Sequence, residues 1–501
     1  MMAVHGAQSP TVSATLLACV VAQLMLQSVD SSECLETFSD KENYFPSSVQ
    51  VSVAPRSQLS KISTIVQTAG LFSIDYGSSF KVITEHMAKE QYVLVQCGAP
   101  NVTEAEIDAV APLPSQQHTR KTFRVPLRQI ATESTVQLSY LHELGLADRV
   151  EFTSKYAVGP CWQKSKACNG GYEGAWGDAV TKATQDASVD AIFVDCSAAP
   201  CSSSSNPKEV HFSASQDPGP LNTAEHIKFM AAFFNKEDQA NTIFAKTLRD
   251  YNNLIQAPAA NAPKVAWIEF AAQSSWSAES FKVSMAGYKT RYITHAGGLN
   301  LDVSAMQSSL GSKLVVADVV PGVPLSGQKL TLATSGYSSK SEASTAFFAA
   351  LADVDVVIDE TYAPTPSSYS FSSFLTNFDL TSASALPFIA NQKVFRIDGT
   401  ISSENNLDWF ESRLMHPQWV LGDLKDALHG TGGSRKYLRN IAASESPQVI
   451  TSSSCTTLLP ACNDATTSEA IPMLFTPTSV SPAMRHAAPL VVVFLLLLAG
   501  A

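Results

Sequence analysis

The sequence predicts an α/β fold of two lobes joined by one long helix, with a small β-rich extension in front. Strand-like and helix-like patterns alternate over residues 123–222 and again over 258–430. Because β-α-β order implies a parallel sheet flanked by helices, each lobe should be Rossmann-like. Between them, residues 223–257 hold the longest helical pattern, with apolar residues recurring every three or four positions. Ligands bind at the carboxyl ends of strands in such sheets, so the cleft should lie between the lobes.

Local patterns place the elements of the extension and the first lobe. In the extension, residues 32–122, β-forming residues predict strands at 80–84 and 92–96. The first lobe should hold strands at 123–127, 146–152 and 190–195. Its helices should cover 132–144, which begins at a hydroxyl cap and ends before Gly145, and 178–187.

The same alternation returns after the linking helix. Short apolar runs predict strands at 264–270, 354–358 and 393–397. Helical spacing predicts helices at 280–296, 341–352 and 417–429. These elements make up the second lobe.

Both ends of the chain resemble processing signals. Residues 1–31 contain an apolar run followed by small polar residues, which is typical of a signal peptide. Residues 431–481 are rich in serine and threonine and should form a stalk. Residues 482–501 end in an apolar run too short to span a bilayer comfortably, with no basic tail, as in a glycolipid-anchor signal. We therefore expect the mature chain on the outer face of a plasma membrane.

The composition excludes some classes of partner. The 501 residues carry a formal net charge of −11, with 45% hydrophobic and 16% charged residues. This balance is typical of a packed globular protein. An acidic chain does not suit nucleic acid, because phosphate binding needs a basic surface.

The cysteines indicate an oxidising compartment. Nine are present, and Cys19 falls within the signal. The remaining eight are disulfide candidates, for which the spacing leaves the connectivity open. Local pairs would be Cys161 with Cys168, Cys196 with Cys201 and Cys455 with Cys462, which leaves Cys34 with Cys97. The sequon Asn101-Val-Thr103 predicts a glycan.

No catalytic signature stands out. The chain has no G-x-S-x-G elbow, Walker loop, G-x-G-x-x-G fingerprint or H-E-x-x-H zinc motif. Asp359 and Glu360 follow a predicted strand and fit a solvated strand end better than a catalytic pair. We expect neither an enzyme nor a resident metal or cofactor.

Several segments carry a family resemblance. They are Ile130-Ala-Thr-Glu-Ser-Thr135, Leu144-Gly-Leu-Ala-Asp-Arg-Val150, Glu225-His-Ile-Lys-Phe-Met230, Ala296-Gly-Gly-Leu-Asn300 and Asn406-Leu-Asp-Trp-Phe-Glu411. In this order, residues 80–429 resemble the helix-linked substrate-binding proteins of bacterial ABC importers for cobalamin and iron chelates. The resemblance implies a surface protein that captures a small molecule, here cobalamin, for uptake through a partner receptor or transporter.

The resemblance and the strand ends together nominate ligand contacts. The family has a ligand-contacting tyrosine where this chain has Tyr156, and an aromatic contact where it has Trp176. Trp276, Trp409 and Glu411 lie in loops after strands. Aromatic faces suit the partly apolar corrin edge, and a carboxylate can accept hydrogen bonds from its amides.

Two alternatives remain open. An iron-chelate binder would need cations against an anionic ligand, and Arg413 is the only cation near the candidate loops. A surface adhesion or cell-wall protein that lost its ligand would also explain the stalk and the tail. The single cation favours the neutral corrinoid over an iron chelate, and the aromatic loops of both lobes speak against a lost ligand site.

Overall fold

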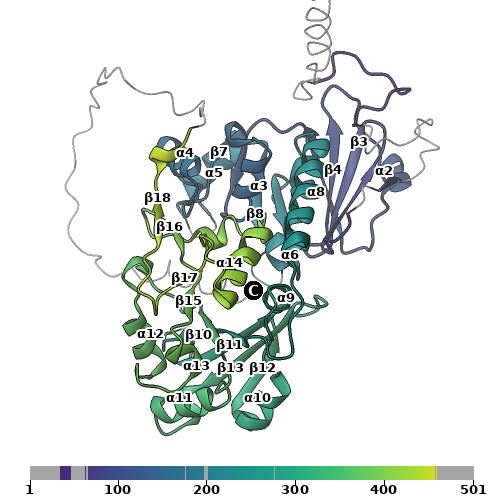
Figure 1. Cartoon of the computed structure of the whole chain (residues 1–501). Coiled ribbons are helices and arrows are strands. Elements are labelled where there is room, and N and C mark those ends of the chain that lie inside the picture. The colour runs from purple at the N-terminus through teal and green to yellow at the C-terminus, as the bar shows by residue number, and fades with distance from the viewer. Residues whose placement is uncertain are drawn as a thin grey trace, which may run out of the picture.

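The computed structural model describes residues 34–46, 62–63, 66–174, 177–196, 201–275, 277–456 and 459. The predicted signal peptide, the anchor signal and most of the stalk lie outside these residues. The fold is mixed α/β, with an N-terminal sheet packed on a first lobe and a second lobe below them (Figure 1). None of the described helices is long and apolar enough to span a membrane.

The N-terminal extension is a five-stranded sheet, which confirms its β-rich character. Its strands lie in chain order: β1 (Ile62–Ser63), β2 (Phe72–Tyr76), β3 (Phe80–Glu85), β4 (Glu90–Gln96) and β5 (Thr119–Val125). Helix α2 (Glu104–Val110) starts with a capping box between Thr103 and Glu106. The strand expected to open the first lobe at 123–127 is instead the end of β5, which pairs with β4 in parallel.

The first lobe has a four-stranded parallel sheet, as its alternating pattern predicts. The strand order is β7 (Val150–Phe152), β6 (Ile130–Thr132), β8 (Ala191–Asp195) and β9 (Glu209–Phe212). Its helices are α3 (Leu138–Glu143), α4 (Pro160–Asn169) and α5 (Ala179–Ser188). Gly145 follows α3 with φ +66°, a left-handed conformation that glycine adopts without strain.

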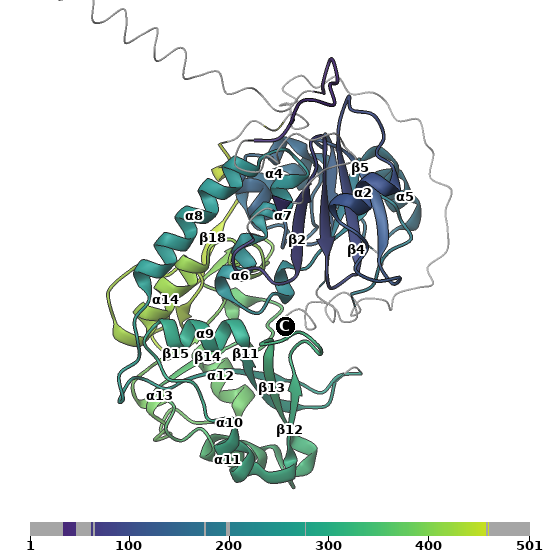
Figure 2. The same cartoon turned by 90° about the vertical axis from the view of Figure 1, so that its right-hand side faces the viewer.

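The linking helix is shorter than predicted. Residues 223–257 are not one helix, because the chain turns between α6 (Pro220–Glu225), α7 (Ile227–Ala232) and α8 (Glu237–Leu254). Asn235 has φ +55°, which ends the helical path before α8. Helix α8 then runs from the first lobe to the second (Figure 2). Its Phe244 is buried in the first-lobe core and its Tyr251 in the second-lobe core.

The second lobe has a seven-stranded mixed sheet instead of a purely parallel one. Its order is β12 (Leu314–Asp318), β13 (Gly327–Ala333), β11 (Ser280–Ala286), β10 (Val265–Ala271), β14 (Val356–Asp359), β15 (Val394–Arg396) and β17 (Arg439–Asn440). Only β10, β14 and β15 are parallel neighbours. The helix predicted at 280–296 is wrong over its first half, which forms β11, and only α9 (Gly287–His295) is helical.

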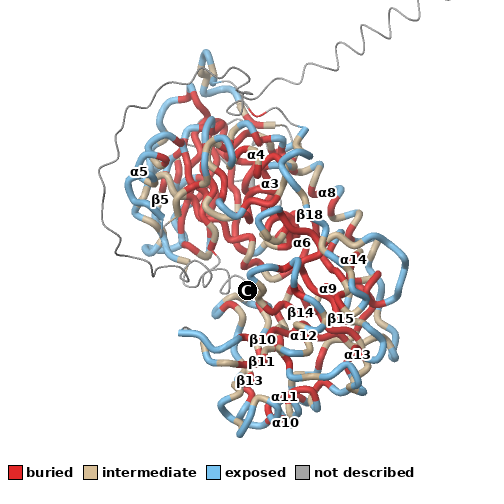
Figure 3. The backbone as a smooth tube through the Cα atoms, turned by 90° about the vertical axis from the view of Figure 1, so that its left-hand side faces the viewer, coloured by how far each residue is buried: buried red, intermediate tan, exposed pale blue. Residues whose placement is uncertain are grey.

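Five further helices complete the second lobe, and Figure 3 shows buried backbone running through both lobes. They are α10 (Val303–Leu310), α11 (Lys340–Ala349), α12 (Phe371–Phe378), α13 (Pro387–Ala390) and α14 (Pro417–His429). Residues 431–456 do not stand off as a stalk. They carry β17 and β18 (Gln448–Ile450), and their Tyr437 and Leu438 are buried in the core.

Three disulfides join described cysteines. They are Cys34–Cys97, Cys196–Cys201 and Cys161–Cys455. The third corrects the local pairs Cys161–Cys168 and Cys455–Cys462, because the C-terminal segment folds back onto α4. Cys168 is also disulfide-bonded, and Cys462 lies outside the described residues.

Candidate ligand site at the lobe junction

The segment 408–415 of the second lobe crosses to the first lobe. It begins with the short 3-10 helix η8 (Asp408–Phe410). The Thr135 hydroxyl donates to the Phe410 carbonyl over 3.2 Å, and the Thr223 hydroxyl donates to the Leu414 carbonyl over 2.9 Å. Leu414 and Met415 are buried in the first-lobe core. This segment therefore fixes one edge of the lobe junction.

The Glu411 carboxylate is the central polar contact of this junction. Its Oε2 accepts from the Val158 amide over 2.6 Å and its Oε1 from the Gly159 amide over 2.8 Å. Both amides belong to the loop after β7, at the start of α4. Burial raises the pKa of Glu411 to about 8, and the charge of Asp408 adds to the rise, although the two amide donors act against it. Glu411 thus holds the other lobe and is not open to a ligand in this arrangement.

Tyr156 lies in the loop that Glu411 holds. It is two residues before Val158, whose amide donates to Glu411. The side chain of Tyr156 is 37% exposed, which leaves part of the ring accessible. Of the predicted aromatic contacts that the structure describes, Tyr156 is the one with an exposed face.

Trp409 lies inside the second lobe. It is 1% exposed and packs on Trp267 and Tyr437, with ring centroids 5.7 and 5.8 Å away. A ring enclosed in this way has no free face for a ligand in this arrangement. Trp176 and Trp276 lie outside the described residues.

Arg413 is the most unusual side chain of the junction. Its guanidinium carbon lies 4.5 Å from the ring centroid of Tyr288 and 5.0 Å from that of Trp409. The residue is 7% exposed, and its Nε has no hydrogen-bond partner. Within the described ranges, no carboxylate lies within ion-pair distance of it. Its charge acts on Tyr140 of the first lobe and on Glu360 of the second, so it lies near groups of both lobes.

A buried ion pair lies beside Arg413. The Lys289 ammonium in α9 contacts the Glu360 carboxylate over 2.5 Å and donates to the Ser284 hydroxyl over 2.9 Å. Lys289 also lies over the Trp267 ring, 5.3 Å from its centroid. Sequence reasoning missed Tyr288 and Lys289, because it read 280–296 as one helix. The carboxylate pair Asp359-Glu360 was expected to be a solvated strand end, but both residues are buried, at 0% and 7% exposure.

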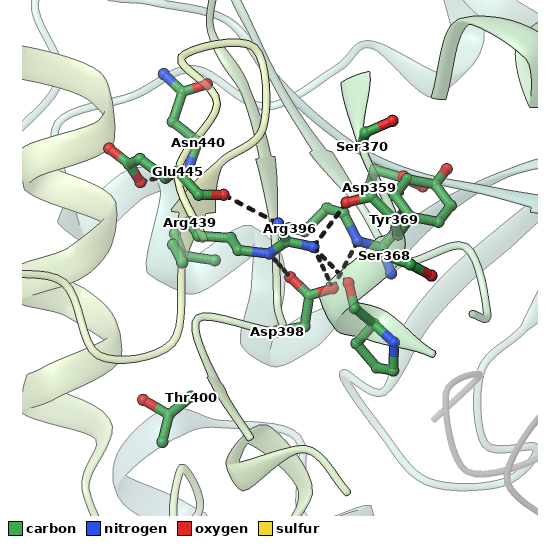
Figure 4. A network of polar contacts seen from close by, with 12 residues as sticks. Asp359, Ser368, Tyr369, Ser370, Arg396, Asp398, Thr400, Arg439, Asn440 and Glu445 are labelled. Atoms are coloured by element: carbon green, nitrogen blue, oxygen red, sulfur yellow. Dashed lines mark hydrogen bonds and ion pairs between the residues drawn. The ribbon is translucent and has the colours of Figure 1, made fainter. Parts of the chain in front are cut away.

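A second polar network lies deeper in the second lobe. Asp398 accepts from Arg396 over 2.8 Å and from Arg439 over 2.6 Å, and Arg396 also donates to Asp359 over 2.7 Å (Figure 4). Next to it is a pocket of about 340 Å³ lined by Arg435, Arg439 and Glu445 among others. Both arginines of the pocket already have carboxylate partners: Arg435 pairs with Asp426 and Glu445, and Arg439 pairs with Asp398. This network therefore stabilises the fold. In the part of the chain that the structure covers, no three His, Cys, Asp or Glu residues group to hold a metal ion.

Comparison with known proteins finds similar solved structures but no matching family model or curated protein. No protein-family model matches the sequence, and the search of curated proteins found no match. Solved structures that are similar include a periplasmic binding protein from Veillonella parvula at 13% identity, covering 60% of this chain and 91% of that one with TM-score 0.38.

Two more are a periplasmic heme binding protein from Pseudomonas aeruginosa and the petrobactin-binding protein YclQ from Bacillus subtilis. The first has 13% identity, covers 63% of this chain and 98% of that one, and has TM-score 0.38. The second has 13% identity, covers 60% and 92%, and has TM-score 0.38. At such scores, these similarities carry no argument about the function of this chain.

Proposed function

We propose that this chain is a helix-linked substrate-binding protein that captures a small-molecule ligand where its two lobes meet. The observation that carries the proposal is Arg413, a largely buried guanidinium held between two aromatic rings at the lobe junction. Among the described residues, Glu360 interacts with this charge but lies beyond ion-pair distance of it, so a ligand oxygen would supply a close partner. The exposed face of Tyr156, on the first-lobe side, supplies an apolar contact.

The proposed ligand is cobalamin, captured at the cell surface for uptake, as in the algal cobalamin acquisition protein that the chain resembles. A corrinoid is nearly neutral and rimmed by amides, and Arg413 can donate to amide carbonyls. Tyr156 offers a flat surface for the corrin edge. In this proposal Trp409 and Glu411 act from behind the site, by supporting Arg413 and the Tyr156 loop.

One observation favours the alternative, an anionic iron chelate. Lys329 on β13 is half-buried, and no ion pair of Lys329 occurs among the described residues. Burial lowers its pKa; the charge of Glu269 acts against this, whereas the charges of Lys282 and Lys289 act with it. Lys282 already pairs with Glu269 and Lys289 with Glu360, so Lys329 is the cation left for a ligand. Such a cation suits catecholate, carboxylate or hydroxamate oxygens better than a neutral corrinoid.

Calorimetry of the secreted chain separates the two ligands. We would titrate it with cyanocobalamin, with haem and with ferric chelates of different net charge, at low and high salt. Attraction to an anionic chelate should weaken as salt screens charge, whereas corrinoid binding should change little. Binding of none of these ligands would refute the proposal and leave the adhesion alternative.

Variants test where the ligand binds. Arg413→Gln should weaken binding by roughly tenfold to a hundredfold, because a hydrogen bond to a charged group contributes about 1.5–3 kcal/mol. Tyr156→Ala should weaken it through lost apolar contact. Arg249→Gln is the matched control, because Arg249 has a 66% exposed side chain on α8. Equal affinity of the Arg413 and Arg249 variants would contradict the assigned site.

We also propose that the chain is exported, glycosylated at Asn101 and anchored by a lipid. Asn101 is exposed, and the hydrogen bond from Arg124 ends on its Oδ1 and not on the Nδ2 that a glycan would join. Asn101→Gln should abolish a mass shift that peptide-N-glycosidase removes from the native chain. Release of the protein from cells by a phosphatidylinositol-specific phospholipase would support the anchor, and retention would argue against it.

A further inference from the structure

The chain returns to the first lobe after it has completed the second. Residues 445–455, here called the strap, leave β17 and form β18, which pairs in parallel with β16 (Thr400–Ser402) of the second lobe. The strap then reaches α4 of the first lobe. In Figure 1, β16 and β18 run along one side of the molecule and α8 along the other, with α14 between them.

Gln163 of α4 connects the strap to the junction. Its Nε2 donates to the Ile450 carbonyl over 3.1 Å and to the Val158 carbonyl over 2.6 Å. Its Oε1 accepts from the Ser403 hydroxyl over 3.3 Å. One buried side chain thus holds the strap, the segment after β16 and the loop that Glu411 holds.

A covalent bond completes this connection. Cys161 of α4 is bonded to Cys455 at the end of the strap, across 294 residues of sequence. Leu459, just beyond, is 7% exposed and packs into the first-lobe core. The lobes are therefore joined covalently by the chain through α8 and by the strap with its disulfide, in addition to the packing of segment 408–415 on the first lobe.

We propose that the strap and the Cys161–Cys455 disulfide lock the two lobes in one relative arrangement. A single linking helix allows rotation about its own hinge, but a second connection on the opposite side blocks that rotation. Ligand exchange then takes place without wide opening of the lobes. The lock goes beyond the proposed function, because it does not depend on which ligand binds.

The lock is sensitive to thiols. Cys455 is partly exposed and is flanked by exposed Ser454 and Thr456, so a dithiol reductant can reach it. Reduction breaks the sulfur–sulfur bond and forms two cysteine thiols, while the dithiol gives two electrons and two protons and becomes a disulfide. The strap is then held by hydrogen bonds and packing alone, and the lobes gain freedom to separate.

The rate of amide hydrogen exchange at the junction measures how often the lobes separate, and it can be measured without a ligand. The Val158 and Gly159 amides donate across the junction to Glu411, so their exchange reports separation of the lobes. In the Cys161→Ser/Cys455→Ser variant of the full chain, we expect these two amides to exchange at least about tenfold faster than in the native chain. Amides of β8, inside the first lobe, should keep their native rates.

Controls separate the lock from general stability. Cys34→Ser/Cys97→Ser removes a disulfide within the N-terminal part and should leave the Val158 and Gly159 rates unchanged. Gln163→Met keeps the disulfide and removes the hydrogen bonds of Gln163 to Ile450 of the strap, to Ser403 and to Val158, so it gives a milder increase even if the cysteine variant does not fold. Native rates at Val158 and Gly159 in both strap variants would overturn the proposal. Equal acceleration in β8 would overturn it too, because the bond would then only stabilise the first lobe.

Discussion

Replacing Glu411 by glutamine tests the electrostatics of the junction. Burial and Asp408 raise the pKa of Glu411 from its ordinary value of 4.5 to about 8 in the folded chain. The folded pKa is thus above the unfolded one, so the protonated form is favoured by folding. The stability linked to this group is fully present below pH 4.5 and is lost as the pH rises through 8.

The size of the effect follows from the shift. One pKa unit corresponds to about 1.4 kcal/mol. Between about pH 5 and pH 8, ionisation of Glu411 in the unfolded chain should therefore lower the free energy of unfolding by about 3.5 kcal/mol. Glutamine is neutral at every pH, so the unfolding free energy of the variant does not change with the ionisation of residue 411. Its side-chain NH₂ cannot accept a hydrogen bond, so one of the two bonds from the Val158 and Gly159 amides is lost. Glu411→Gln should start less stable at pH 5 and lose less stability toward pH 8.

Urea unfolding at several pH values measures this difference. The quantity of interest is the unfolding free energy of the native chain minus that of the variant, because titration elsewhere cancels. Glu404→Gln is the matched control. Glu404 lies seven residues before Glu411 and also contacts the first lobe, through Lys166, but its side chain is 58% exposed. A native-minus-variant difference that is flat across the range, or that rises with pH, would refute the reasoning. It would mean that the Val158 and Gly159 amides keep Glu411 ionised throughout.

Three further changes test the fold that positions the site. Asp398→Asn leaves Arg396 and Arg439 without their shared buried carboxylate and should lower the unfolding free energy by about 3–5 kcal/mol in urea. Phe233→Ala removes a fully buried ring among other aromatic rings and should lower it by about 3–5 kcal/mol, with a matching fall in Tm. Thr103→Ala removes the cap of α2 and should cost only about 1 kcal/mol, seen as faster amide exchange in α2. A small effect at Asp398, or a large one at Thr103, would contradict the burial on which these estimates depend.

The sequence predicted those elements whose signals are local. Helix α14 was found with its bounds, because Pro417 at its first turn and Gly430 after its end mark both limits. The strand β8 is a short apolar run with an acidic end, and it lies where predicted. Such elements need no knowledge of their partners.

Other elements depend on pairing that a local pattern does not contain. Residues 280–286 carry Phe281 and Val283 two positions apart, a strand spacing that merges with the helical spacing of the following α9. The sequence of strand β5 is typical of the first strand of a lobe. It pairs in parallel with β4 instead, and therefore belongs to the N-terminal sheet. Strand partners are chosen by tertiary contacts, so these assignments failed.

The candidate site shows the same division. Tyr156 was nominated from the family resemblance and its place at a strand end, and Glu411 from its place after a strand; the fold joins Glu411 to the Val158 amide, two residues after Tyr156. The role of Glu411 as an acceptor for the other lobe depends on how the lobes dock, which no spacing reveals. The Cys161–Cys455 bond joins residues 294 positions apart, and many pairings of eight cysteines are compatible with the spacing.

Because Trp409 is buried, it can support Arg413 but cannot contact a ligand in this arrangement. Its ring is enclosed by Trp267 and Tyr437, yet it lies 5.0 Å from the Arg413 guanidinium. A guanidinium over aromatic faces is stabilised by roughly 0.5–2 kcal/mol, which is less than the cost of burying a charge with no anionic partner. The rings can therefore hold Arg413 in place but cannot fully compensate its desolvation. The remaining deficit is what an oxygen of a ligand would supply, whether it belongs to a corrin amide or to an iron chelate.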